Sequence, residues 1–135
     1  MRKALSLGFG VAKPWGDDER YDFIIARGRF FWRIQVKSFW KIKNVYRVMT
    51  SSSRDRLYTP ELIDFLVIYL VAEELWYVIP AGIGLHGSLY LAPRSRRSKY
   101  LQYIEAWHLF DSCPQWSACH SLQSETATES PQRSR

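Results

Sequence analysis

Three residues in the first third of the chain carry side chains suited to metal-assisted chemistry on a phosphate: Asp22, Gln35 and Lys37. A carboxylate and an amide oxygen are hard ligands of the kind that Mg²⁺ accepts while it keeps several of its waters. An ammonium group beside them can hold a phosphate or steady a water that the metal activates. The three groups can act together only if the fold brings them to one face.

The segment 21–38 is predicted to be a β-hairpin that does this, because apolar and polar residues alternate along it at period two. The apolar set is Phe23, Ile25, Phe30, Trp32, Ile34 and Val36. A type II′ turn at Gly28-Arg29 would place Asp22 opposite Gln35. A turn one residue earlier would place Asp22 opposite Arg33, with the same three side chains still on one face. A solvated polar face without chemistry is the alternative, since antiparallel sheets commonly turn one face to water.

The order Asp22, twelve residues, then Gln35-Val36-Lys37-Ser38 resembles the core motif of the PD-(D/E)xK nuclease superfamily, with Gln in place of the second acid. A wider similarity covers roughly residues 4 to 110 and includes VAKPWGDDERYDFIIARGRFFWRIQVKS, WYVIP at 76–80 and YLQYIEAWHLF at 100–110. In this wider region the chain is similar to a bacterial endonuclease-like family related to intron-homing enzymes and archaeal Holliday-junction resolvases. The resemblance implies an α/β, restriction-endonuclease-like core, in which a mixed sheet with a central hairpin is flanked by helices.

The resemblance also implies an activity, the hydrolysis of phosphodiester bonds in DNA with Mg²⁺ or Mn²⁺. Asp22 and Gln35 would hold the metal, and Lys37 would complete the catalytic group. Related nucleases have a Glu on an upstream helix, but no Glu precedes Glu19 here, so a start shortened relative to the family is expected. The acids at 17–19 could supply the missing ligand or be solvated loop residues. A homo-oligomer is expected by the same resemblance.

Composition agrees with a polyanionic partner, because the net charge is +6 and the pI is about 9.5. Nucleic acid is the commonest such partner, and an anionic membrane surface is the next. The positions expected to contact DNA are Lys41, Lys43, Arg54, Arg56, Arg94, Arg96, Arg97 and Lys99. Trp40 and Tyr46, which lie among or beside these lysines, could stack on bases or cover an edge of the sheet. The basic loops could equally be solvated connections.

Two further functions stay open at this point. The first is a shortened nuclease fold that binds nucleic acid without cleaving it, with an affinity that falls steeply with salt. The second is an interaction module that uses its aromatic surface for protein contacts and shows little salt dependence. The aromatic content of 16% is its only positive signal.

Other elements follow from local patterns. We expect a helix over 1–8, strands at 9–12, 45–49, 65–71, 76–79 and 88–92, and a helix after Ser98. A short helix should begin at Thr59, with Pro60 in its first turn. The stripe Tyr100, Tyr103, Ile104 and Trp107 should pack on the core. Asp64, directly before a buried strand, should face water or support the site from behind.

The chain divides into a nuclease-like domain, 1–110, and a polar tail, 111–135, whose composition predicts disorder. Both cysteines, Cys113 and Cys119, lie in this tail, which indicates no disulfide framework and a cytoplasmic setting. A zinc site that adds His120 is not expected, because structural sites need four ligands. We find no signal peptide and no apolar run long enough to span a bilayer, so no membrane association is expected.

Overall fold

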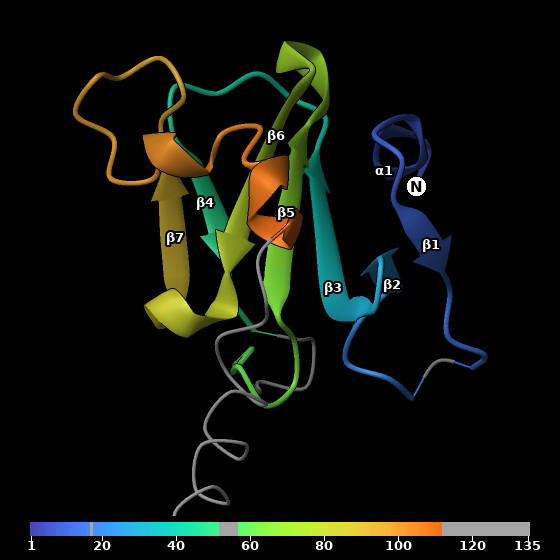
Figure 1. The fold of residues 1–135 in the computed structure, drawn as a ribbon. Helices are drawn as coiled ribbons and strands as arrows, with labels where there is room; N and C mark the ends of the chain where they lie inside the picture. Colours follow the sequence, from blue (N-terminus) through green and yellow to red (C-terminus); the bar gives the residue numbers. More distant parts are fainter. Residues whose placement is uncertain (17, 52–56, 112–135) are drawn as a thin grey trace, which may run out of the picture.

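The computed structural model describes residues 1–16, 18–51 and 57–111. Its largest element is a five-stranded sheet in the order β1-β2-β3-β5-β6 (Figure 1). The strands are β1 (Gly10–Ala12), β2 (Phe23–Arg27), β3 (Phe30–Phe39), β5 (Phe65–Leu70) and β6 (Leu75–Pro80). Residues 112–135, for which disorder is predicted, lie outside the described residues, as do Arg54 and Arg56.

β3 is the central strand of this sheet. It pairs antiparallel with β2 on one edge and parallel with β5 on the other, where Ile34 lies opposite Phe65. The remaining pairs, β1 with β2 and β5 with β6, are antiparallel. The predicted mixed sheet with a central hairpin is therefore confirmed.

A second sheet contains only β4 (Tyr46–Met49) and β7 (Ser88–Leu91), paired antiparallel, and we call it the ribbon. The sequence placed 45–49 as a third strand following the hairpin. The structure instead pairs it with β7, because β5 occupies the edge of β3 that was open to it.

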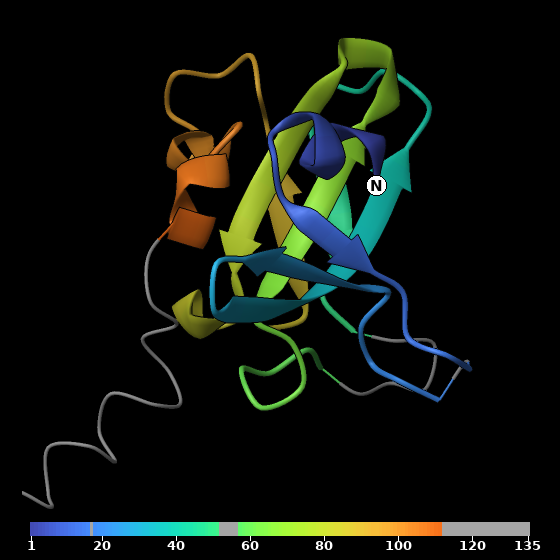
Figure 2. The ribbon, with the colours of Figure 1, turned by 45° about the vertical axis from the view of Figure 1, so that its right-hand side comes forward.

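Each face of the five-stranded sheet carries its own apolar core. One face packs against α1 (Arg2–Ser6) and the 3₁₀ helix η4 (Trp107–Asp111), and the other packs against the ribbon. Figure 2 shows this layering, with α1 in front of the sheet and the ribbon behind it. Phe110 is fully buried in the first core, where its ring contacts those of Phe9, Trp32 and Phe65.

The prediction of a helix after Ser98 is wrong. The chain forms the 3₁₀ helix η3 (Leu101–Tyr103), and Ile104 then makes a β-bridge to Tyr77 of β6. Glu105 follows with a positive φ of 48°, which an α-helix does not allow. Its carboxylate accepts hydrogen bonds from the backbone N–H of Trp76 at 3.1 Å and from Trp107 Nε1 at 2.7 Å. The apolar stripe does pack on the core, but it divides between the two faces of the sheet.

The short helix expected from Thr59 is also absent from the described segment 57–64. Its backbone makes a turn in which the N–H groups of Leu62 and Ile63 both donate to the carbonyl of Thr59, at 2.9 and 3.0 Å. Two further 3₁₀ helices, η1 (Val71–Glu73) and η2 (Ala81–Ile83), complete the described elements.

No helix in the described part of the chain combines the length and the hydropathy of a transmembrane segment.

Candidate active site

The hairpin turn sets the geometry of the site. Gly28 has φ +59°, whereas Arg29 is not among the residues with positive φ, as a type II′ turn requires. Arg27 therefore pairs with Phe30, and the register continues to Phe23 opposite Ile34. The next pair outward is Asp22 and Gln35, so the first of the two predicted registers is the one that forms.

Asp22 is hydrogen-bonded directly to the strand that it faces. Its Oδ2 accepts from Gln35 Nε2 at 2.7 Å and from the backbone N–H of Val36 at 2.8 Å. An ionised carboxylate only accepts hydrogen bonds, so the amide nitrogen of Gln35 faces Asp22 and the amide oxygen is turned elsewhere. Within the described residues, Oδ1 of Asp22 and Oε1 of Gln35 have no hydrogen bond, which leaves both oxygens available for a ligand.

Lys37 lies on the same face of β3, two residues beyond Gln35. Its Nζ is 5.5 Å from the ring centroid of Tyr58, a buried residue of the segment before β5. Burial lowers the pKa of Lys37, and the negative charge of Asp22 acts in the opposite direction. Burial raises the pKa of Tyr58, and the charge of Asp22 adds to that effect. A carboxylate, an amide, an ammonium and a phenol ring thus gather on one sheet face.

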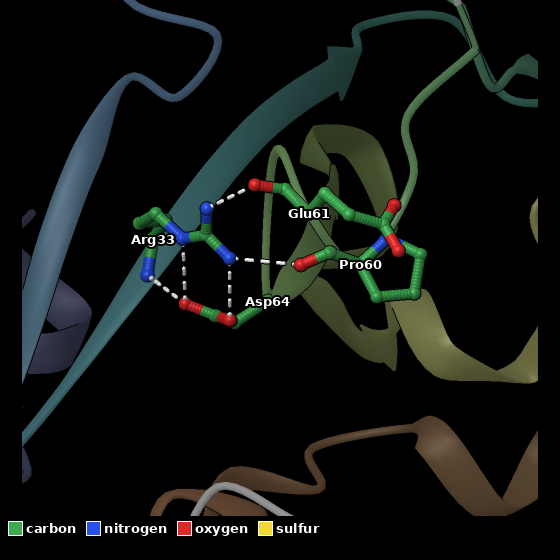
Figure 3. A network of polar contacts seen from close by, with 4 residues as sticks. All are labelled: Arg33, Pro60, Glu61 and Asp64. Atoms are coloured by element: carbon green, nitrogen blue, oxygen red, sulfur yellow. Dashed lines mark hydrogen bonds and ion pairs between the residues drawn. The ribbon is translucent and has the colours of Figure 1, made fainter. Parts of the chain in front are cut away.

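Arg33 and Asp64 join β3 to the segment that precedes β5 (Figure 3). Arg33 donates from Nε to Oδ2 of Asp64 at 3.2 Å, from Nη2 to Oδ1 at 3.0 Å, and from its backbone N–H to Oδ2 at 2.7 Å. The guanidinium also donates to the carbonyls of Pro60, at 2.8 Å, and Glu61. The hydrogen bond to Asp64 is the main reason that the pKa of Arg33 is raised. We call this group of contacts the Arg33–Asp64 clasp.

The clasp corrects the interpretation of Asp64 as a water-facing acid. Its side chain is only 18% exposed and is bound to Arg33. By fixing residues 60–64 on β3, the clasp also holds the segment that carries Tyr58 toward Lys37. Sequence reasoning missed this group, although an acid directly before a fully buried strand and an Arg on the polar face of the hairpin were both visible.

A cavity of about 260 Å³ opens beside Asp22. Its lining residues are Lys13, Pro14, Gly16, Glu19, Tyr21, Asp22 and Phe23. Of the acids proposed to replace the upstream Glu, Glu19 reaches this cavity, Asp18 does not line it, and Asp17 lies outside the described residues. No cluster of three or more His, Cys, Asp or Glu side chains occurs in the described ranges. The available donors are therefore the oxygens of Asp22 and Gln35, with Glu19 as a further acidic residue that lines the same cavity.

Those predicted DNA-contacting cations that the structure describes do not line this cavity. Lys41 and Lys43 follow β3, and Arg94, Arg96, Arg97 and Lys99 follow β7, all of them exposed. Because no α-helix begins at Ser98, helix N-terminal amides do not add to the charge of the second group. Trp40 is 75% exposed, whereas Tyr46 is buried and its hydroxyl donates to Glu73 at 2.7 Å.

Comparison with known proteins identifies a family and similar solved structures. A PD-(D/E)XK endonuclease family matches residues 1–110. The solved structure of a bacterial homing endonuclease, I-Ssp6803I, is 32% identical in sequence and superposes with a TM-score of 0.64, covering 80% of this chain and 82% of the other. No curated protein gives a match.

Proposed function

The chain belongs to the PD-(D/E)XK endonuclease family, and we propose that it is a metal-dependent endonuclease that hydrolyses phosphodiester bonds in DNA. The observation that carries the proposal is the convergence of Asp22, Gln35 and Lys37 on one face of the hairpin, in a register fixed by the turn at Gly28. These side chains are the candidate catalytic residues, and the similar solved structure is that of a homing endonuclease.

The donor set fits a hard divalent cation. Oδ1 of Asp22 and Oε1 of Gln35 are hard oxygen donors on two residues joined by a hydrogen bond, and the cavity of about 260 Å³ beside Asp22 has room for retained waters. Asp22 and Gln35 would hold Mg²⁺ or Mn²⁺, and Glu19 is placed to add a carboxylate from the cavity wall. When bound, the metal would polarise the scissile phosphodiester and lower the pKa of an attacking water.

Lys37 would stabilise the negative charge that develops on the phosphate. Its neighbours support this role in two ways. The nearby charge of Asp22 favours the ammonium form of Lys37, against the effect of burial. The ring of Tyr58, 5.5 Å from Nζ, limits where that ammonium can lie.

DNA is the proposed substrate, and the exposed cations at 41–43 and 94–99 would contact its phosphates. Such contacts supply affinity without reading the base sequence. Contacts by Arg54 and Arg56, a homo-oligomeric state and a cytoplasmic location stay predictions.

Cleavage of supercoiled plasmid by the purified chain, with Mg²⁺ or Mn²⁺ and with EDTA, tests the proposal. Nicking should need the metal and should fall about 100-fold or more in Asp22→Asn, which removes an anionic metal ligand, and in Lys37→Ala, which removes a cation that stabilises developing charge. Ser38→Ala is the matched control, since Ser38 neighbours Lys37 but belongs to the opposite face of β3.

Two results would count against an endonuclease that uses this site. Nicking that survives both site substitutions would place the activity elsewhere. Salt-sensitive DNA binding with no cleavage in either metal would favour the alternative, a nuclease fold that binds nucleic acid without cutting it.

A further inference from the structure

The ribbon has one buried face and one exposed face. Tyr46, Val48, Leu89 and Leu91 point into the core, and the alternate residues point to solvent. On the exposed face Arg47 lies opposite Tyr90, and Met49 lies opposite Ser88. Tyr90 is 57% exposed and Met49 is 47% exposed. This outer face therefore presents an arginine and an aromatic ring side by side, with no described element packed over them.

Positive charge is concentrated on the ribbon and its flanking loops. Residues 40–49 and 86–99 contain seven Lys and Arg and no Asp or Glu. Since the whole chain has a net charge of +6, the remaining residues together are slightly negative. The basic character of this protein is thus a property of one structural unit.

Residues 40–45, before β4, and residues 92–99, after β7, form two basic loops. These two loops lie at the same end of the ribbon, the upper end in Figure 1. Both approach Glu73 of η1, which accepts from the hydroxyl of Tyr46 and lies 3.9 Å from Nε of Arg94. The backbone N–H of Lys43 donates to the same hydroxyl at 3.2 Å. Glu73 offsets Arg94 alone: the other six cations form no ion pair within the described residues.

We propose that the outer face of the ribbon docks in a groove of duplex DNA, with the two basic loops on the flanking phosphates. The occupant follows from charge complementarity and from size, because the major groove is about 12 Å wide and admits a two-stranded ribbon. Arg47 and Tyr90 are then the side chains that reach base edges, and Lys41, Lys43, Arg96, Arg97 and Lys99 are the phosphate contacts. The ribbon lies on the side of the sheet that carries Asp22, Gln35 and Lys37.

This inference rests on the proposed function, but binding can be measured without cleavage. Fluorescence anisotropy with a labelled duplex in EDTA gives the affinity and its dependence on salt. The double variant Arg47→Ala/Tyr90→Ala should weaken binding about tenfold or more, as loss of a base contact does. The variant Arg96→Ala/Arg97→Ala should reduce the slope of log affinity against log salt by about two, close to one unit for each phosphate contact.

The control matched in charge to Arg96→Ala/Arg97→Ala is Arg2→Ala/Arg29→Ala, which removes two cations from exposed positions outside the ribbon and its loops. It should change the affinity less than twofold. Equal losses in the control and the ribbon variants would overturn the inference, because binding would then follow net charge alone. Binding of the wild-type chain to vesicles containing phosphatidylserine, without binding to the duplex, would also overturn the inference. Absence of cleavage in Mg²⁺, with these binding differences intact, would reject the proposed activity and leave the docking surface in place.

Discussion

Truncation of Asp64 should destabilise the protein far more than loss of an ordinary surface acid. The carboxylate accepts three hydrogen bonds from Arg33, at 2.7, 3.0 and 3.2 Å. Hydrogen bonds to charged groups contribute about 1.5–3 kcal/mol each and are not additive. The side chains of Arg33 and Asp64 are 34% and 18% exposed, so water screens part of that energy. We expect Asp64→Ala to lower the free energy of unfolding by about 2–4 kcal/mol, between the surface and buried limits.

Urea unfolding followed by tryptophan fluorescence measures this change, and a double-mutant cycle with Arg33→Met isolates the two side chains, because the backbone N–H of Arg33 remains in every variant. The coupling energy should be about 1.5–3 kcal/mol. The pair Arg27–Asp111 is the matched control, because its atoms are only 2.6 Å apart while its side chains are 45% and 50% exposed. Asp111→Ala should cost about 1 kcal/mol or less. A coupling of about 0.5 kcal/mol or less for the clasp would refute the reasoning, since it would then behave as a surface ion pair.

Two further predictions concern ionisable groups. Lys37→Met should raise the urea midpoint at pH 7: burial lowers the pKa of Lys37, so the folded state holds this proton less tightly than the unfolded state. The gain should shrink as the pH rises through the folded pKa, and a gain independent of pH would contradict this cause. Tyr77→Phe should stabilise the fold by about 1 kcal/mol, because the Tyr77 hydroxyl is buried without a hydrogen-bond partner within the described residues. Burial raises the pKa of Tyr77 to about 12 from an ordinary value of 10.0. The free energy of unfolding of the wild type should therefore decrease as the pH rises from 10.0 to about 12, and that of Tyr77→Phe should decrease less, which pH-jump unfolding would measure.

The hairpin could be predicted from sequence because local rules determine it. The alternating apolar residues specify which face is buried, and Gly28 supplies the positive φ that a type II′ turn needs. Once the turn is set, the position of Asp22 across from Gln35 follows by counting. The buried strands β5 and β6 were found for a similar reason, since each is a continuous apolar run.

Partner choice between distant strands is not written in such local patterns. Nothing within 45–49 distinguishes a strand that joins the hairpin from one that pairs with β7. Arg33 and Asp64 are 31 residues apart, and each taken alone resembles an ordinary surface charge. The helix expected around Tyr100–Trp107 does not form, although its apolar residues have helical spacing. These residues pack on two separate cores, one on each face of the sheet, and Glu105, which lies between the two groups, has a positive φ that ends any helix.

The non-helical segment after Ser98 also affects how this protein resists aggregation. β6 is the last strand of its sheet, and an uncovered edge offers unpaired N–H and C=O groups to any other chain. Ile104 bridges to Tyr77, and the backbone N–H of Glu105 donates to the carbonyl of Trp76 at 2.8 Å, so part of this edge is already satisfied. At the opposite edge, β1 is only three residues long and provides little template. Loss of residues 101–105 would therefore uncover an apolar six-residue strand and favour intermolecular β-sheet growth.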